Sequence, residues 1–244
     1  MRAIVTGDIG CYTLGALPPL SAMDTTVDMG ASVSMAHGFE LALAGTEHRP
    51  IVAVIGDSTF AHSGLSSLIS TVYNRGAGTV CVLDNRTTAM TGHQDNPGIE
   101  ATLSLGTVAP VDIAGLCRAC GVEKVLTADA FDLAAVRKAL EECTAYDGVS
   151  VLITRGDCVF VSRSPKPARV VDADKCIACG KCIQSGCPSV VLSDAVPVRR
   201  KAPQDREAQG PHRTRDLRRL RHLRPDLSRP RHLRPRTSLR SASP

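Results

Sequence analysis

The sequence predicts an α/β fold, with an open, mostly parallel β-sheet and helices on both of its faces. Three observations support this fold class. Short runs of almost only apolar residues recur along residues 1–160, glycine and aspartate bound these runs, and segments with a helical pattern separate them. Continuous apolar runs are typical of parallel strands that are buried on both faces. Their alternation with helical segments favours an open parallel sheet covered by helices on both sides.

The individual elements follow in order from the same patterns. The expected strands are residues 3–6, 51–55, 79–83 and 149–153. The expected helices are residues 31–44, 63–74, 112–120 and 132–144. In sheets of this kind, ligands bind at the carboxyl ends of the strands, so the functional residues should directly follow each strand.

Three further segments come after this domain. Residues 161–172 have the composition of a linker, and residues 173–198 form a small Cys-rich module. The tail, residues 199–244, contains no aromatic residue, no Val and no Ile. Such a stretch cannot bury enough apolar surface to offset the entropy lost on ordering, so we expect the tail to be disordered.

Composition narrows the class of protein. The chain has 244 residues, of which 43% are hydrophobic but only 3% aromatic, with no Trp, so its core must be built from Val, Ile, Leu and Ala. No run of 18 uncharged apolar residues is present to form a transmembrane helix. The N-terminal apolar run is too short for a signal peptide. We therefore expect a cytoplasmic protein without a membrane partner.

The positive net charge belongs to the tail. Residues 199–244 hold 15 Lys and Arg against 4 Asp and Glu, whereas the rest of the chain holds 14 against 20. One explanation of this tail is an altered reading frame after about residue 198, and the other is a genuine basic arm. The tail has no aromatic residues to stack on bases, which disfavours a specific nucleic-acid partner. Any binding to polyanions would be non-specific and sensitive to salt.

The first expected strand ends in a glycine-containing loop, Gly7-Asp8-Ile9-Gly10-Cys11. Two glycines three residues apart allow the backbone to approach a ligand, and free N–H groups there can bind phosphate oxygens. The loop matches neither the dinucleotide-binding motif nor the P-loop. By itself it is also compatible with an ordinary turn between strand and helix.

The next two strands end in Gly56-Asp57-Ser58 and in Asp84-Asn85. Asp57 and Asn85 are separated by the span of one helix and one strand, so adjacent strand ends would bring their side chains within reach of one ion. A carboxylate, an amide oxygen and a backbone carbonyl form the hard-oxygen site that Mg²⁺ prefers, completed by water and a diphosphate. The alternatives are that Asp57 caps the following helix and that Asn85 forms a turn.

These loops carry a family resemblance. Gly56-Asp57-Ser58, followed after about 26 residues by Asn85, resembles the diphosphate-binding motif of thiamine-diphosphate enzymes. Residues 7–11 and 88–94 resemble the 2-oxoacid:ferredoxin oxidoreductases, in particular the alpha subunits of the indolepyruvate type. Residues 28–32 and 73–75 fit the same family. The resemblance extends from residue 1 to about residue 195 and implies a thiamine-diphosphate-binding fold.

The resemblance implies a role for each matching residue. Mg²⁺ would be bound by the side chains of Asp57 and Asn85 and by the carbonyl of Thr87, while Gly56 and Ser58 would contact the diphosphate. The thiazolium side would be lined by Gly7, Asp8, Ile9, Gly10, Cys11, Met29 and Gly30. His93 would lie in the loop beyond the metal, where a structural role is favoured over that of a general base.

The cysteine run is the most specific motif of the sequence. Cys176-x₂-Cys179-x₂-Cys182-x₄-Cys187-Pro188 is nearly the bacterial [4Fe–4S] pattern, with one additional residue before the last cysteine. Zinc sites more often pair two C-x₂-C hairpins across a longer insert. No cysteine follows Cys187, so the second run of a two-cluster ferredoxin is missing. Either Cys187 bends back to complete one cluster, or clusters assemble poorly.

The activity implied by the resemblance is the oxidative decarboxylation of an arylpyruvate such as indolepyruvate. Coenzyme A would take the acyl group, and electrons would pass through the iron–sulfur centre to ferredoxin. A glutamate from a pyrimidine-binding domain is also required. That domain would come from another subunit or from an upstream part of a longer chain, so we expect this chain to be inactive alone. The alternatives are an electron-transfer subunit without its own catalysis, or a non-functional truncated product.

Overall fold

The computed structural model describes residues 2–46, 49–102, 106–162, 171–172, 175–177, 179–184, 190–192 and 212–214. The chain forms two compact units, Met1–Pro165 and Lys166–Pro244. Cys187, most of the expected linker 161–172 and most of the tail 199–244 lie outside the described residues.

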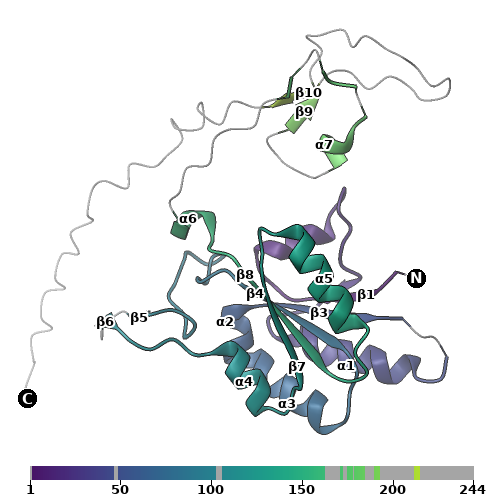
Figure 1. Cartoon of the computed structure of the whole chain (residues 1–244), viewed down its shortest axis with the longest axis vertical. Helices are drawn as coiled ribbons and strands as arrows, with labels where there is room; N and C mark the ends of the chain where they lie inside the picture. Colours follow the sequence, from purple (N-terminus) through teal and green to yellow (C-terminus); the bar gives the residue numbers. More distant parts are fainter. Residues whose placement is uncertain are drawn as a thin grey trace, which may run out of the picture. The chain divides into compact units, whose positions relative to one another are not determined.

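A six-stranded parallel sheet forms the centre of the first unit (Figure 1). Its strand order is β2-β1-β3-β4-β8-β7, and every neighbouring pair is parallel. The strands are β1 (Ile4–Gly7), β2 (Thr25–Thr26), β3 (Ile51–Gly56), β4 (Thr79–Asp84), β7 (Lys124–Asp129) and β8 (Ser150–Arg155). The predicted α/β class and the parallel sheet are confirmed.

Side chains alternate between the two faces of this sheet, as the period of a β-strand requires. On one face, Ile55, Val82 and Ile153 occupy matching positions of β3, β4 and β8 and belong to the larger hydrophobic cluster. On the other face, Leu152 packs in a smaller cluster with Ala128. Because both faces are buried, β3 and β4 read as continuous apolar runs in the sequence.

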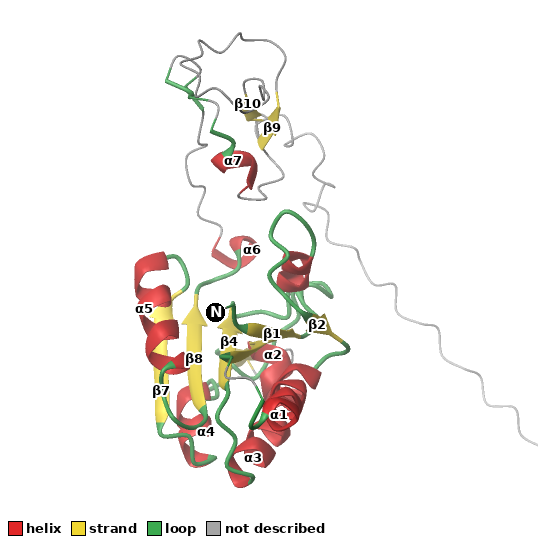
Figure 2. Ribbon diagram, turned by 90° about the vertical axis from the view of Figure 1, so that its right-hand side faces the viewer, coloured by secondary structure: helices red, strands yellow, loops and turns green. Residues whose placement is uncertain are grey.

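Helices cover both faces (Figure 2). The larger cluster includes residues of α1 (Ala31–Leu43), α3 (Leu65–Tyr73) and α4 (Ile113–Ala119), whereas α5 (Leu133–Thr144) packs on the smaller one. Asp132 begins α5, since its carboxylate accepts hydrogen bonds from the N–H groups of Ala134 and Ala135, both at 3.0 Å. Of these helices, α1, α4 and α5 lie where the sequence predicts them, within one residue at each end.

The helix predicted over residues 63–74 begins earlier than expected. It starts at Asp57 with α2 (Asp57–Thr59), passes through one π-helical segment, η2 (Phe60–Gly64), and continues as α3. The side chain of Phe60 in this segment is fully buried. A π-turn is a common feature near functional sites, and the pattern of apolar residues alone does not reveal it.

Two strands of the sheet were not predicted. β7 lies at the edge of the sheet, carries charged residues at both ends and is mostly half-exposed, so it lacks a continuous apolar run. β2 has only two residues and follows the 3₁₀ helix η1 (Cys11–Ala16). A second small sheet pairs β5 (Ala101–Thr102) with β6 (Gly106–Thr107), and α6 (Val159–Ser162) follows β8.

The described part of the second unit contains α7 (Lys181–Gln184) and an antiparallel pair of short strands, β9 (Val190–Leu192) and β10 (His212–Thr214). The tail was predicted to be disordered, and the prediction is wrong for these three residues of β10. A strand pair is held by backbone hydrogen bonds, which need no apolar side chains and leave no compositional signal.

Among the residues described here, no helix is both long and apolar enough to span a membrane.

Candidate functional site

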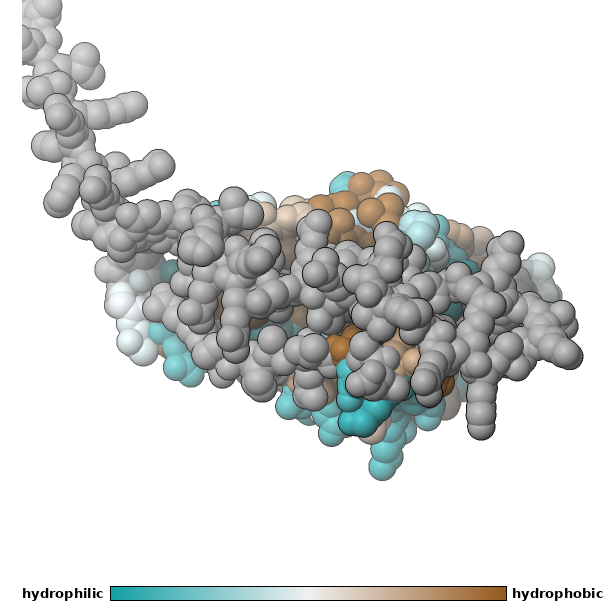
Figure 3. Space-filling view, turned by 90° about the horizontal axis from the view of Figure 1, so that it is seen from above, coloured by the Kyte–Doolittle hydropathy of each residue, from teal (hydrophilic) through white to brown (hydrophobic). Residues whose placement is uncertain are grey.

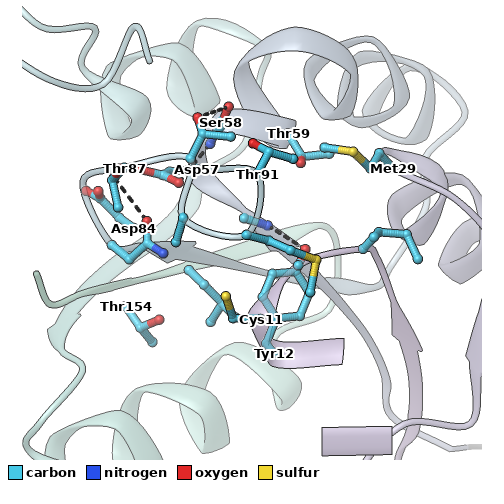
Figure 4. A pocket seen from close by; sticks show the side chains of 18 of the residues that line it. Cys11, Tyr12, Met29, Asp57, Ser58, Thr59, Asp84, Thr87, Thr91 and Thr154 are labelled. Atoms are coloured by element: carbon cyan, nitrogen blue, oxygen red, sulfur yellow. Dashed lines mark hydrogen bonds between the residues drawn. The ribbon is translucent and has the colours of Figure 1, made fainter. Parts of the chain in front are cut away.

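A cavity of about 340 Å³ opens at the carboxyl ends of β3, β4 and β8 (Figure 4). Nine of the twelve residues predicted to hold the cofactor line its wall: Ile9, Gly10, Cys11, Met29, Gly56, Asp57, Ser58, Asn85 and Thr87. They come from four segments that are far apart in the sequence. The structure therefore places Asp57 and Asn85 on the wall of one cavity, as the sequence argument requires.

Asp8 lies behind this wall instead of in it. It is fully buried, and both of its carboxylate oxygens accept hydrogen bonds from the N–H of Gly30, at 2.7 and 2.8 Å. Oδ1 also accepts from the N–H of Ile9 at 2.8 Å. Burial raises the pKa of Asp8. The carboxylate thus ties the first loop to the start of α1.

Gly7 and Gly30 also do not line the cavity. Gly30 has a φ of 99°, in the left-handed region that glycine adopts without strain, and it directly precedes α1. A side chain at Gly30 would collide with Ser63, and one at Gly7 would collide with Met23. These positions need glycine for close packing around the loops.

Asp57 is buried, and both of its carboxylate oxygens accept hydrogen bonds. Its Oδ1 accepts a hydrogen bond from the N–H of Ser58 at 2.8 Å, and its Oδ2 accepts one from the side-chain amide of Asn96 at 3.2 Å. Burial, the largest cause, and the nearby charge of Asp84 raise the pKa of Asp57, and the hydrogen bonds to its carboxylate lower it, so that it lies at about 6. Asp57 is not the cap of the following helix, because Gly56 occupies the N-cap position.

Asn85 does form a turn, as the alternative interpretation proposed. Its Oδ1 accepts a hydrogen bond from the N–H of Thr87 at 3.1 Å, and the intervening Arg86 has a φ of 64°. An amide oxygen has two lone pairs, so this bond leaves it able to accept a second partner or to ligate a cation. The turn and the predicted ligand role are therefore compatible.

A hydrogen bond joins the two predicted metal-binding loops. The hydroxyl of Thr88 donates to the hydroxyl of Ser58 at 2.9 Å. The backbone N–H of Thr88 donates to the carbonyl of Gln94 at 2.9 Å. The loop after β4 is thereby closed on itself and attached to the start of α2.

The donor set at this corner of the cavity suits a divalent cation. Asp57, Asp84 and Thr87 lie together there (Figure 4), and both carboxylates are buried. Arg155 forms an ion pair with Asp84 at 2.8 Å. Oδ1 of Asp84 is the only buried side-chain polar atom without a hydrogen-bond partner within the described part of the chain. Hard oxygen ligands and an excess of buried negative charge are what Mg²⁺ requires.

Sequence reasoning missed two residues of this site. The hydroxyl of Tyr12 accepts a hydrogen bond from the N–H of Gly56 at 3.0 Å, and its ring lies in the cavity wall. Burial raises the pKa of Tyr12. Asp84 is a carboxylate at the end of an apolar strand. Burial of a charge there costs free energy unless the charge is paired or binds a cation, and this cost could have identified Asp84 from the sequence.

His93 has a φ of 64°, and its ring centroid lies 5.0 Å from that of Phe160, with the ring planes tilted by 52°. This contact between the loop after β4 and α6 agrees with the structural role favoured by the sequence.

The cysteine run is only partly described. Cys176 and Cys182 are half-buried and Cys179 is exposed, while Cys187 lies outside the described residues. In the described ranges, no three His, Cys, Asp or Glu side chains are arranged to hold a metal ion. The iron–sulfur cluster therefore remains a prediction.

Comparison with known proteins defines the class of this domain. Residues 8–154 match the family model of the thiamine pyrophosphate enzyme C-terminal TPP binding domain. The chain belongs to this family of thiamine pyrophosphate enzymes.

Six curated relatives match the chain, and each is named indolepyruvate oxidoreductase subunit IorA, from a different organism. Indolepyruvate oxidoreductase subunit IorA of Pyrococcus horikoshii is 40% identical over 207 residues, which is 78% of this chain and 32% of the relative. IorA of Methanothermobacter marburgensis is 42% identical over 191 residues, or 77% of this chain and 30% of the relative. The chain thus spans about a third of the length of these relatives.

A solved structure supports the fold alone. The 2-oxoglutarate:ferredoxin oxidoreductase from Magnetococcus marinus, determined with 2-oxoglutarate, coenzyme A and succinyl-CoA bound, superposes with a TM-score of 0.56 at 16% sequence identity. The match covers 70% of this chain and 63% of that one.

Proposed function

We propose that this chain binds thiamine diphosphate through Mg²⁺ and serves as the cofactor-binding part of a 2-oxoacid:ferredoxin oxidoreductase of the indolepyruvate type. The observation that carries the proposal is the convergence of residues 9–11, residues 56–58, Asn85 and Thr87 on one cavity. Asp57, Asn85 and the carbonyl of Thr87 would hold the metal. Gly56 and Ser58 would contact the diphosphate.

Each of these elements has a physical task. The cofactor, once bound, supplies an acceptor for the electron pair released in decarboxylation. Asp57 contributes negative charge in a buried place, where its attraction for a cation is strong. The hydrogen bond between Thr88 and Ser58 keeps the two metal-binding loops at a fixed separation. Ile9, Cys11 and Met29 contribute apolar side chains to the wall of the cavity.

The remaining parts of the activity belong to partners. We propose that a pyrimidine-binding domain, from another subunit or another part of a longer protein, completes the site and that the chain is inactive without it. Leu14, Leu17 and Leu20 are all more than half exposed in and after η1, which begins at the cavity wall. Figure 3, a view from above, shows that some hydrophobic residues lie at the surface. An apolar surface of this kind suits a protein partner.

The cysteine run supports the electron-transfer half of the proposal. One [4Fe–4S] cluster would be bound by Cys176, Cys179, Cys182 and Cys187, and it would pass electrons to ferredoxin. Coenzyme A would take the acyl group. A non-oxidative decarboxylase would not need this module. The second candidate function is an electron-transfer subunit without catalysis of its own, which the same cysteines favour.

Calorimetric titration of the full chain with thiamine diphosphate in the presence of Mg²⁺ separates these candidates. We expect binding that requires Mg²⁺ and that Asp57→Asn reduces at least tenfold, since it removes the ionised ligand. Asp129→Asn is the matched control. Asp129 is the last residue of β7, so it also lies at the carboxyl end of a strand of this sheet, but it does not line the cavity. Absence of Mg²⁺-dependent binding by the unmodified chain would favour the electron carrier.

A further inference from the structure

Asp84 is the last residue of β4 and directly precedes Asn85. Its side chain is 2% exposed and lies in the cavity wall. Oδ2 accepts a hydrogen bond from Nε of Arg155 at 2.8 Å. Oδ1 is buried and has no hydrogen-bond partner within the described residues.

The ion pair with Arg155 explains only half of this arrangement. Asp84 and Arg155 are register partners at the ends of β4 and β8, so the sheet itself brings the two side chains together. The Arg155 side chain is half-exposed, whereas that of Asp84 is not. A purely structural ion pair would leave no reason to bury the second carboxylate oxygen unpaired, because an unsatisfied buried charge costs several times what a surface pair contributes.

None of the described residues supplies the missing donor. The neighbouring groups of the cavity corner are the carboxylate of Asp57, the amide oxygen of Asn85 and the carbonyl of Thr87, which are all acceptors. A water molecule bound to a divalent cation is a strong donor, and Mg²⁺ usually retains several waters when proteins bind it. Outer carboxylates that accept hydrogen bonds from such waters fix the orientation of the metal site.

We propose that Asp84 is a positioning residue for the metal: its unpaired Oδ1 accepts a hydrogen bond from a water on the cation, and Arg155 holds the carboxylate in place. This inference rests on the proposed function, since it requires the cation that Asp57 and Asn85 would bind. It assigns different tasks to two consecutive residues: Asp84, the last residue of β4, orients a water of the metal, and Asn85, which follows the strand, contacts the metal.

The test uses the full chain and Mn²⁺ as the probe, detected through its effect on water proton relaxation at saturating thiamine diphosphate. Asp84→Asn preserves the shape of the side chain but removes its charge. We expect the dissociation constant of Mn²⁺ to rise about tenfold or more. The melting temperature without metal should stay unchanged or rise, because an unpaired buried charge has been removed.

A merely structural ion pair predicts the opposite pattern. In that case Asp84→Asn would lower the melting temperature of the metal-free protein and leave Mn²⁺ binding as tight as in the unmodified chain, and this result would overturn the proposal. Arg155→Gln, which frees the carboxylate while keeping its charge, should weaken Mn²⁺ binding by a smaller factor. If Asp84→Asn does not fold, Mn²⁺ binding by Arg155→Gln tests the proposal instead. Unchanged binding in this variant would then overturn the proposal.

Two controls separate this inference from the proposed function. Asp129→Asn should bind Mn²⁺ like the unmodified chain. If the unmodified chain does not bind Mn²⁺ at all, the proposed function fails together with the inference. If it binds Mn²⁺ in a manner that depends on Asp57 but not on Asp84, only the inference about Asp84 fails.

Discussion

Asp57 couples the site to pH through its buried carboxylate. Its pKa in the folded protein, about 6, lies above the ordinary value of 3.8, mainly because burial opposes ionisation. A carboxyl group with a raised pKa contributes stability that is fully present below pH 4 and is lost as the pH rises through 6. A shift of about two units corresponds to about 3 kcal/mol.

This sign gives a prediction for the metal-free protein. The free energy of unfolding of the unmodified chain, minus that of Asp57→Asn, should fall as the pH increases from 4 to 6 and then level off. Mg²⁺ competes with the proton for this carboxylate, so its apparent affinity should decrease by roughly tenfold per pH unit below 6. Urea unfolding and Mg²⁺ titration across this range measure both effects. A stability difference that does not change with pH would show that Asp57 ionises normally.

Tyr12 should stabilise the Gly56-Asp57-Ser58 loop. In Tyr12→Phe the N–H of Gly56 loses its acceptor, and we expect the free energy of unfolding to fall by about 1–2 kcal/mol. Thiamine diphosphate should also bind more weakly, because Gly56 lies in the predicted diphosphate contact. Tyr73→Phe is the control, since Tyr73 is 85% exposed. Equal stability of the two variants, measured by urea unfolding, would contradict this role.

At the level of residues, the sequence predicted positions better than roles. Nine residues chosen from loop motifs line the cavity, because parallel strands deliver their carboxyl ends to one edge. Asp8 could not be separated from them, since a loop residue that binds a ligand and one that binds the next helix look alike in sequence. Tyr12 was missed because its contact with Gly56 joins residues 44 positions apart, and no local pattern records it.

Among the elements, the helix that leaves the predicted metal loop depends on its π-turn. Gly64 ends this turn, and a Cβ there would lie 2.6 Å from Cδ1 of Ile55 and 3.3 Å from Cδ2 of Phe60. Both side chains are fully buried. Gly38 provides a contrast, because it lies in α1 with nothing within 4 Å of the corresponding position.

The same substitution should therefore have opposite effects at the two glycines. Gly64→Ala should lower the free energy of unfolding by about 1–3 kcal/mol through overpacking. Gly38→Ala should raise it by about 0.5–1 kcal/mol, because alanine loses less entropy in a helix. Urea denaturation of the two variants decides the matter. A loss of stability in both would mean that α1 is packed at Gly38 by a surface that is covered in solution.

The sequence predicted the strands that are buried on both faces of the sheet and the helices with a clear apolar face. β3, β4 and β8 are buried on both faces and appear as apolar runs, and α5 has both a cap and an amphipathic pattern. β7 was missed because an edge strand packs only partly and tolerates Lys124 and Asp129 at its ends. The spacing of apolar residues in the sequence identifies buried elements. An edge strand instead forms because its backbone pairs with the neighbouring strand.

At the level of the whole molecule, two groups of cysteines with C-x₂-C spacing have different surroundings. Cys117 and Cys120 lie at α4; Cys117 is fully buried in the larger hydrophobic cluster, and Cys120 packs against it. Burial raises the pKa of Cys117 to about 12, so its thiol stays protonated and cannot ligate a metal readily. The run that begins at Cys176 belongs to the other compact unit, and its first three cysteines are half-buried or exposed.

Anaerobic reconstitution of the full chain with iron and sulfide should therefore yield about four irons per chain, bound by the second unit alone. Cys179→Ser should lose this iron, because each of the four irons of the cluster needs a thiolate ligand. Cys120→Ser, in the pair of the same spacing on α4, should retain it. Iron and sulfide analysis of the three proteins provides the measurement. An iron content near zero in the unmodified chain would mean that Cys187 does not complete the cluster, and that electrons from the proposed decarboxylation must leave through another subunit.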